Sequence, residues 1–236
     1  MAGAGSRFHD IGILKPKHEI IVNGITLFER SMLSLSEFFG EIFLFVVRKD
    51  NYSAVNISEL CKKIGIRRFE IDELTDGQTR TVIKAGRYID PSDAIVVYNI
   101  DTAIESGEIK KSSLDGFDGF ILCFVAKGDH WSFIKPSDTE PYTVVRVAEK
   151  VRIPKLATVG FYYFERFSES QEIALTYQDE IKQQYRELYI APIYQYLIDF
   201  GKKIGYCIID ENKITNLGTP AEIQSIDANF VRDNIE

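Results

Sequence analysis

Apolar runs of strand length alternate with amphipathic stretches of helix length through the first hundred residues. Two of these runs, 41–47 and 93–99, are almost unbroken in hydrophobicity, as strands are when a parallel sheet buries both of their faces. Helices are expected between the strands, at 26–33, 53–64 and 78–88. The alternation predicts βαβ units, and therefore an α/β fold with three layers, α/β/α, around a mixed, mostly parallel central sheet.

The second half of the chain has a different pattern. Strands follow one another with turns between them, which indicates antiparallel pairing, and helices are expected at 169–184 and 190–202. The strands are expected at 119–124, 130–134, 143–150, 158–164 and 204–209. A length of 236 residues fits a single domain over 1–236, with a first half at 1–115 and a second at 116–236.

Composition excludes several classes of partner. A net charge of −7 argues against nucleic acid and against an anionic membrane surface. The chain has no apolar run long enough to span a bilayer and opens on no signal peptide, so a cytoplasmic location is expected. Three widely spaced cysteines, Cys61, Cys123 and Cys207, indicate buried thiols and neither a disulfide set nor a metal site.

Small residues fill the start of the chain, followed by two cations. A backbone built from Ala2, Gly3, Ala4, Gly5 and Ser6 can approach a ligand closely and point N–H groups at it. Arg7 then offers a planar fork suited to phosphate, and Lys17 offers a point charge. The segment therefore fits a polyphosphate, although an ordinary glycine turn with surface cations is the alternative. Neither a dinucleotide fingerprint nor a P-loop is present.

Asp101 follows the buried run that ends at Asn99. Ligands of α/β folds lie at the carboxyl ends of such strands. A carboxylate at that edge can hold Mg²⁺ beside a triphosphate, because Mg²⁺ prefers one or two carboxylates plus phosphate oxygens. The alternative is a plain aspartate in the turn after the strand.

These motifs resemble those of the sugar-phosphate nucleotidyltransferases, the enzymes that make nucleotide-activated sugars. Gly-Ala-Gly-Ser-Arg-Phe at 3–8 with Pro-Lys at 16–17 resembles their signature loop, 99–101 is similar to their metal motif, and Leu-Gly-Thr-Pro at 217–220 is similar to their closing motif. The motifs follow the family's order from Gly3 to Thr219. In the family a strand precedes the glycine loop, so that first strand is expected to be missing from this N-terminus.

The resemblance implies a Rossmann-like nucleotidyltransferase fold and a set of nucleotide-site residues. Arg7, Lys17 and Asp101 would be catalytic, with Mg²⁺ on Asp101 as the cofactor. The nucleotide would be bound by Ala2, Gly3, Ala4, Gly5, Ser6, Arg7, Gly77, Gln78 and Asn99. In the family a turn at this place reads the base, and here that turn holds Gly77 and Gln78. The alternative for this turn is a plain helix cap by Asp76. Asn99 lies at the end of the expected strand.

The resemblance also implies that 1–115 is the nucleotide-binding half and 116–236 is the acceptor-binding half. Lys150 would meet the acceptor phosphate, Glu149 would accept hydrogen bonds from sugar hydroxyls, and Gly160 would let the acceptor approach the backbone. Trp131 would wall the acceptor pocket, or else be a core residue. In isolation, Glu149-Lys150 would be no more than a common surface pair.

Two positions depart from the family pattern. Many relatives carry a second metal-binding Asp where this chain has Asn216, so the second ligand is open, with Asp210 as one substitute. His18 stands where a Pro often follows Pro-Lys; it could touch the acceptor, but a solvated loop histidine is the expectation.

The predicted reaction joins a nucleoside triphosphate to a phosphorylated small-molecule acceptor and releases pyrophosphate. A sugar 1-phosphate is the default acceptor. The segments 17–19 and 131–133 look like those of capsule or surface-polysaccharide cluster members, some of which activate non-sugar phosphates with CTP, so CTP or UTP is favoured. Two alternatives stay open: a non-catalytic nucleotide-binding regulatory subunit, and a glycosyltransferase of related fold, although 99–101 lacks the Asp-x-Asp motif of that class. A homo-oligomer is compatible with the sequence.

Overall fold

The computed structural model describes residues 6–48, 66–71, 75–129, 131–151, 153, 155–185 and 187–235. Its contacts group the chain into two compact units. The first unit comprises 1–74, 99–110 and 212–236, and the second comprises 75–98 and 111–211. The prediction of a single domain with halves at 1–115 and 116–236 stays a prediction. No helix among the described residues is both long and apolar enough to cross a membrane.

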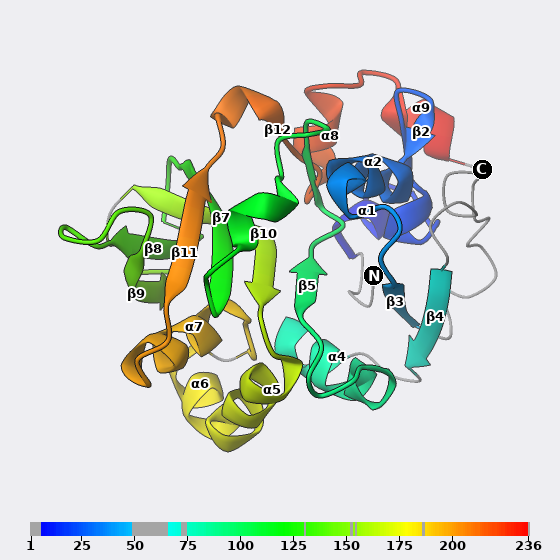
Figure 1. Ribbon diagram of the computed structural model, residues 1–236. Helices are drawn as coiled ribbons and strands as arrows, with labels where there is room; N and C mark the ends of the chain where they lie inside the picture. Colours follow the sequence, from blue (N-terminus) through cyan, green and yellow to red (C-terminus); the bar gives the residue numbers. More distant parts are fainter. Residues whose placement is uncertain are drawn as a thin grey trace. The chain divides into compact units, whose positions relative to one another are not determined.

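The first unit contains short strands and helices (Figure 1). Strands β3 and β4 pair in parallel, whereas β1 with β2 and β6 with β12 pair antiparallel. In chain order its elements are α1 (Ser6–His9), a 3₁₀ turn (Lys17–Glu19), β1 (Ile21–Val22), β2 (Ile25–Thr26), α2 (Leu27–Ser34), a 3₁₀ turn (Ser36–Phe38), β3 (Phe43–Arg48), β4 (Ile66–Ile71), β6 (Thr102–Ile104), β12 (Ile214–Asn216), α8 (Pro220–Gln224) and α9 (Phe230–Asn234).

Two helices of the first unit begin at capping boxes that the sequence encodes. Thr26 accepts a hydrogen bond from the backbone N–H of Glu29, and the Glu29 carboxylate accepts one from the backbone N–H of Thr26. Thr219 and Glu222 repeat this arrangement at the start of α8, where Pro220 occupies the first turn. Below these helices lies an apolar core made of Phe8, Ile13, Ile20, Val22, Leu27, Ala103, Leu217, Ile223 and Phe230.

The second unit is built on a mixed six-stranded sheet. Its strand order is β11-β7-β10-β8-β9, and β5 also pairs with β10 (Figure 1). β11 and β7 are parallel, and the other pairs are antiparallel. The elements are α4 (Gln78–Ala85), a 3₁₀ turn (Gly86–Tyr88), β5 (Ile95–Tyr98), a 3₁₀ turn (Lys111–Leu114), β7 (Gly119–Val125), β8 (Ser132–Pro136), β9 (Val144–Glu149), β10 (Leu156–Phe164), α5 (Phe167–Thr176), α6 (Gln178–Tyr185), α7 (Ala191–Asp199) and β11 (Ile204–Ile208). A last 3₁₀ turn, Glu211–Lys213, leads the chain into the first unit.

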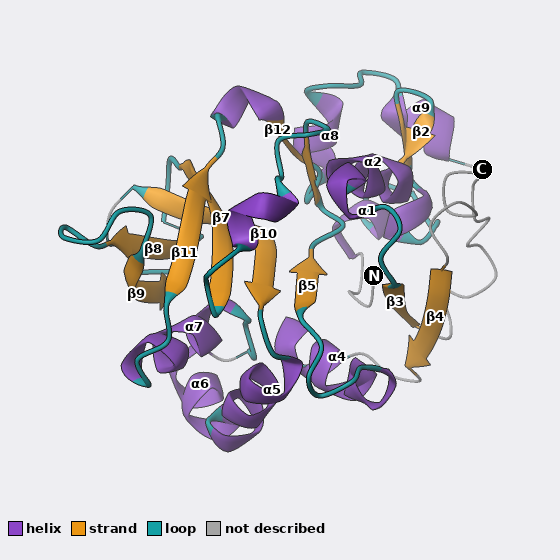
Figure 2. Cartoon of the chain, viewed as in Figure 1, coloured by secondary structure: helices purple, strands orange, loops and turns teal. Residues whose placement is uncertain are grey.

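Helices α5, α6 and α7 group beside this sheet (Figure 2). Tyr194 of α7 is fully buried and its ring stacks on Phe164 of β10, with centroids 4.6 Å apart. Its hydroxyl donates to the Tyr163 carbonyl at 2.7 Å, so a buried polar group is satisfied while the ring fills the core. The α/β class with a mixed sheet is confirmed. The prediction that the pairing is mostly parallel differs from the described strands, among which only β3 with β4 and β7 with β11 pair in parallel and the other pairs are antiparallel.

Local details differ from the sequence expectations. The helix expected at 169–184 is two helices, because Tyr177 leaves helical geometry (φ −104°, ψ 11°) and its ring stacks on Tyr196 of α7 at 4.2 Å. Cys123 is buried as expected, whereas Cys207 is only partly buried. The expected helix at 53–64, Cys61 and the expected absence of a first strand before the glycine loop fall outside the described residues.

Candidate active site

Lys17 and Asp101 meet in the first unit, although they are 84 residues apart in the sequence. The Lys17 Nζ lies 3.4 Å from the Asp101 Oδ2 and donates to the Gly218 carbonyl at 3.5 Å. Both side chains reach solvent, with exposed fractions of 21% for Lys17 and 43% for Asp101. Two of the predicted catalytic residues and the predicted closing motif therefore share one solvent-accessible cluster.

The backbone beneath Asp101 is held from two sides. The Ser31 hydroxyl of α2 donates to the Ile100 carbonyl at 2.7 Å. The Leu217 N–H donates to the Asp101 carbonyl at 2.8 Å, and Asn216 of β12 is the register partner of Thr102. Asn216, at the position of the family's second metal ligand, is thus on the strand next to Asp101, and the carboxylate projects from a fixed backbone.

The predicted phosphate loop is described only at its end. Residues 2–5 (Ala2, Gly3, Ala4 and Gly5) lie outside the described residues, and Ser6 is described only as the start of α1. Arg7 is exposed on α1. Its neighbour Phe8 is buried, and the Lys17 ammonium lies 5.6 Å from the centre of the Phe8 ring. Asn99 is half-buried.

His18 is buried, so the expectation of a solvated loop histidine is wrong. Only 3% of His18 is exposed, and its Nε2 has no hydrogen-bond partner among the described residues. The Glu19 carboxylate lies 3.7 Å from this nitrogen. Burial lowers the pKa of His18 from 6.5 to about 4, so the imidazole is neutral at pH 7. The 3₁₀ turn at Lys17–Glu19 explains the difference, because neighbouring side chains there point in different directions.

The turn at Gly77 requires glycine. Gly77 has φ +131°, and a Cβ on it would lie 2.5 Å from the Leu188 carbonyl oxygen. Leu188 pairs with the turn on both sides, since its N–H donates to the Asp76 carbonyl at 3.1 Å and its carbonyl accepts from the Thr79 N–H at 3.0 Å. The backbone of the 187–189 segment therefore packs directly on the turn that leads into Gln78 and α4.

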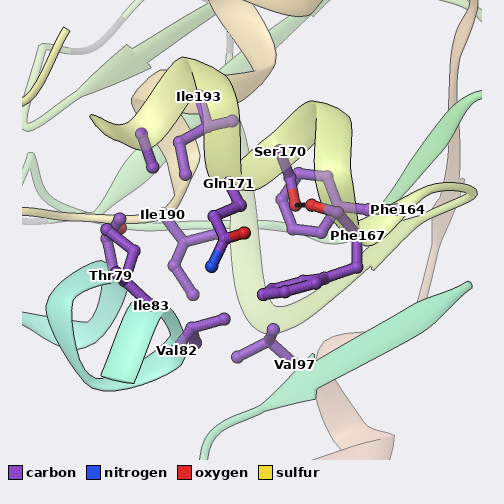
Figure 3. Close-up of a pocket in the computed structure, with 11 residues that line it drawn as sticks. Thr79, Val82, Ile83, Val97, Phe164, Phe167, Ser170, Gln171, Ile190 and Ile193 are labelled. Atoms are coloured by element: carbon purple, nitrogen blue, oxygen red, sulfur yellow. Dashed lines mark hydrogen bonds between the residues drawn. The ribbon is translucent and has the colours of Figure 1, made fainter. Parts of the chain in front are cut away.

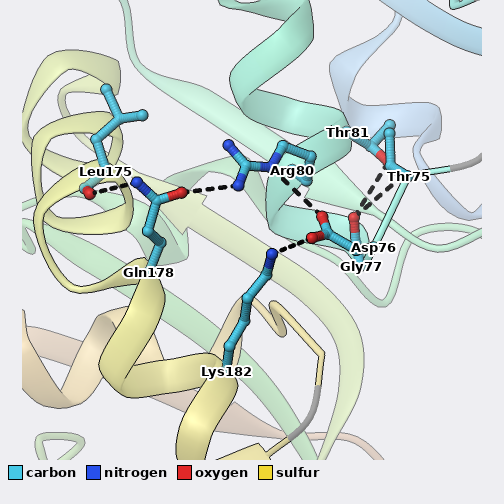
Figure 4. A network of polar contacts seen from close by, with 8 residues as sticks. All are labelled: Thr75, Asp76, Gly77, Arg80, Thr81, Leu175, Gln178 and Lys182. Carbon is cyan, nitrogen blue, oxygen red and sulfur yellow. Dashed lines mark hydrogen bonds and ion pairs between the residues drawn. The ribbon is translucent and has the colours of Figure 1, made fainter.

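Asp76 does not cap α4, so the simple capping alternative is wrong. Gly77 is the N-cap residue and makes no side-chain capping bond. The Asp76 carboxylate instead pairs with Lys182 of α6 and with Arg80 Nε at 3.4 Å, and Arg80 donates to Gln178 at 2.7 Å (Figure 4). The hydrogen bond from Lys182 is the main reason why the pKa of Asp76 is lowered. This network ties the Gly77 turn to α6.

Glu149 and Lys150 point to different environments at the end of β9. Glu149 is 3% exposed and accepts a hydrogen bond from the Ser132 hydroxyl; burial raises its pKa. Lys150 is exposed, has φ +53°, and donates its N–H to the Trp131 carbonyl at 2.9 Å. A positive φ at a residue other than glycine is uncommon and is found often at ligand sites. Glu149 is therefore a buried carboxyl group, and Lys150 is an exposed cation on an uncommon backbone conformation.

Gly160 lies in β10, and Trp131 directly precedes β8. Gly160 has φ +85° and is within the segment where the register of β10 against β7 shifts, between Thr158 and Tyr162. Such a bulge re-aims the backbone of a strand. Trp131 is half-buried and packs edge-on against Phe124 at 5.2 Å, which leaves both interpretations of Trp131 open.

A pocket under α4 is not a phosphate site (Figure 3). Its lining has no charged side chain. The Thr79 hydroxyl is buried there without a hydrogen-bond partner among the described residues. The lining consists of Thr79, Val82, Ile83, Val97, Phe164, Phe167, Ser170, Gln171, Ala174, Ile190 and Ile193. This pocket belongs to the core that supports α4.

Comparison with solved structures decides the family. A nucleoside-diphosphate-sugar pyrophosphorylase from Vibrio cholerae RC9 is 33% identical to this chain, over 98% of both chains, with a TM-score of 0.85. The chain belongs to the sugar-phosphate nucleotidyltransferase family. It is therefore an enzyme of the nucleotidyltransferase class. No family model and no curated protein matches it.

More distant members of the nucleotidyltransferase class share the fold. A UDP-glucose pyrophosphorylase solved with UDP-glucose is 16% identical, over 98% of this chain and 96% of its own, with a TM-score of 0.78. The inositol-1-phosphate CTP transferase from T. maritima is 15% identical, over 99% of this chain and 93% of its own, with a TM-score of 0.67. At these identities the likeness concerns the fold alone.

Proposed function

We propose that this nucleotidyltransferase joins a nucleoside triphosphate, with CTP or UTP favoured, to a sugar 1-phosphate or another phosphorylated capsule precursor in the cytoplasm. An oxygen of the acceptor phosphate attacks the α-phosphorus, the bond between the α-phosphorus and the bridging oxygen breaks, and pyrophosphate leaves. The observation that carries the proposal is the cluster of Lys17, Asp101 and the Gly218 carbonyl. The preference for a pyrimidine nucleotide and the capsule role depend on the sequence resemblance.

The first unit has oxygen donors that fit Mg²⁺. Asp101 offers a half-exposed carboxylate, and Asn216, on the neighbouring strand, has an amide oxygen. The described residues contain no group of three or more His, Cys, Asp and Glu side chains that could hold a metal. A single carboxylate is nevertheless compatible with Mg²⁺, which keeps several waters and takes further oxygens from substrate phosphates. When bound, Mg²⁺ would polarise the α-phosphate.

Two cations of the first unit, Lys17 and Arg7, act on the pyrophosphate leaving group. Lys17 is held by Asp101 and Gly218 before substrate arrives, so little ordering is needed when charge develops on pyrophosphate. Arg7 offers a second, more exposed cation with the planar geometry that suits phosphate oxygens. With no covalent intermediate required, catalysis here is positioning plus charge neutralisation.

The second unit supplies the residues proposed for the base and the acceptor. The backbone at Gly77 and Gln78, at the N-terminus of α4, would read the base. Lys150 would hold the acceptor phosphate, whose charge otherwise repels the triphosphate. Glu149 would accept hydrogen bonds from acceptor hydroxyls, because its carboxylate is already fixed by Ser132.

A thermal-shift screen tests the proposal. CTP, UTP, dTTP, GTP and ATP are each added with and without Mg²⁺, since a ligand that binds only the folded chain raises the melting temperature. We expect one pyrimidine nucleotide to give the largest shift, in a Mg²⁺-dependent way, and the Mg²⁺-dependent part to disappear in Asp101→Ala. Asp233→Ala is the matched control, because Asp233 is also 43% exposed and paired with a cation. Equal shifts for both variants would remove Asp101 from the metal site, and binding without turnover would favour the non-catalytic alternative.

A further inference from the structure

The segment just before α7 contacts both of the substrate-site features of the second unit. Leu188 pairs through its backbone with Asp76 and Thr79, on either side of Gly77. Its neighbour Tyr189 contacts Lys150, which is 39 residues away in the sequence. No sequence motif marks this segment.

The Lys150 ammonium is held by the Tyr189 hydroxyl, to which it donates a hydrogen bond. This contact places the ammonium beside the phenol oxygen, 4.4 Å from the centre of the ring. At its other end, the Lys150 side chain leaves a backbone fixed at φ +53° by the bond from its N–H to Trp131. A flexible lysine is therefore restrained at both ends.

We propose that Tyr189 is a positioning residue that holds the Lys150 ammonium ready for the acceptor phosphate, an inference that rests on the proposed role of Lys150. A phenol suits this task better than a carboxylate would. It restrains the ammonium without neutralising it, so the full positive charge stays available to the phosphate. Leu188 in turn fixes Tyr189, because the neighbouring backbone is hydrogen-bonded on both sides to the Gly77 turn.

The electrostatics around the pair agree with this arrangement. The hydrogen bond to Tyr189 is the main reason why the pKa of Lys150 is raised, with smaller contributions from Glu149 and Glu187. Burial is the main reason why the pKa of Tyr189 is raised. Lysine charged and phenol neutral is therefore the state of the pair near pH 7.

The test uses inorganic phosphate as the probe, because it carries only the group that Lys150 is proposed to bind, and it is run with saturating CTP so that the proposed triphosphate site at Arg7 and Lys17 is already filled. Its dissociation constant is measured by calorimetry for the wild type, Tyr189→Phe, Lys150→Met and the double variant. We expect Tyr189→Phe, which keeps the ring, to weaken binding by about threefold to tenfold, the usual net size of one ordinary hydrogen bond, because the phenol acts on the phosphate only through the lysine. In the Lys150→Met background the same change should have no further effect. Tyr142→Phe, at an exposed tyrosine of the same unit, is the control.

A pH series separates positioning from a general structural effect. Phosphate keeps its dianionic form above about pH 8, so loss of binding at higher pH reports loss of the lysine charge. Because the phenol hydrogen bond raises the pKa of Lys150, Tyr189→Phe should lose binding at a lower pH than the wild type. A variant that was merely loosened would weaken binding without moving that midpoint.

Each outcome identifies what fails. If Lys150→Met leaves phosphate binding unchanged, the proposed role of Lys150 fails and the role of Tyr189 fails with it. If Lys150→Met weakens binding but Tyr189→Phe does not, only the role of Tyr189 is overturned. The same holds if Tyr189→Phe has an equal effect in both backgrounds. Should Tyr189→Phe fold poorly, Tyr189→Trp keeps the ring face and removes the phenol, and the same comparison applies.

Discussion

Acid should destabilise the first unit through His18. The imidazole is 3% exposed, and burial lowers its pKa from 6.5 to about 4. Below pH 6.5 the unfolded chain takes up a proton that the folded chain excludes. The titration of His18 therefore does not lower the free energy of unfolding above pH 6.5, and it lowers it progressively as the pH falls toward 4. At 1.36 kcal/mol per pKa unit the maximum loss is about 3 kcal/mol, of which about 2 kcal/mol falls between pH 7 and pH 5.

The total pH dependence of stability includes groups of the opposite sign. Burial raises the pKa of Glu19 and of Glu149, so each of these carboxyls disfavours the folded state as the pH rises through its ordinary titration range. The effect of His18 must therefore be isolated by comparison with a variant. His18→Gln is neutral at every pH and keeps both carboxyls.

The assay is urea-induced unfolding followed by far-ultraviolet circular dichroism at pH 7, 6 and 5. The free energy of unfolding of the wild type relative to His18→Gln should fall by about 2 kcal/mol from pH 7 to pH 5. His9→Gln is the matched control, because His9 is exposed on α1. A difference between wild type and His18→Gln that stays constant over this range would refute the reasoning from burial. An equally large change for His9→Gln would assign the effect to something other than the site of His18.

Three further predictions concern the proposed substrate residues. Gly77→Ala should lower the free energy of unfolding by about 2 kcal/mol more than Gly40→Ala does, as measured by urea unfolding. Both glycines have positive φ, but only at Gly77 would a Cβ lie 2.5 Å from Leu188. Equal losses would mean that this contact can relax. Asp101→Ala should abolish turnover with a nearly unchanged melting temperature, and a collapse of folding would instead make Asp101 structural. Lys150→Ala should raise the KM for the acceptor far more than the KM for the nucleotide in steady-state kinetics, whereas equal increases would remove Lys150 from the acceptor site.

The parts of the fold that could be predicted are those that nearby residues determine. The apolar run that became β5 and the Thr-x-x-Glu boxes at Thr26 and Thr219 carry their signal within a few positions. The break between α5 and α6 could not be predicted in this way. It depends on the stacking of Tyr177 against Tyr196, a contact that exists only once α7 is in place.

In the candidate site, too, local motifs predict some residues, whereas contacts between distant residues cannot be predicted from the sequence. Lys17 and Asp101 were identified from motifs, but their contact across 84 residues is a property of the folded chain. His18 was wrongly expected to be solvated, because a polar residue beside Lys17 suggests a surface loop, whereas the 3₁₀ turn directs it inward. The contact between Tyr189 and Lys150 could not be predicted, because nothing in the sequence near Tyr189 indicates a lysine 39 residues away.

The most direct test of the account is acceptor-dependent release of pyrophosphate. Purified chain is incubated with Mg²⁺, each of the five nucleoside triphosphates in turn, and a panel of sugar 1-phosphates and phosphorylated polyols, with pyrophosphate measured by a coupled enzyme assay. The account predicts release with one nucleotide and one acceptor together, none when either is omitted, and none in Asp101→Ala. Undiminished release in Asp101→Ala, or none from any combination with the wild type, would contradict it.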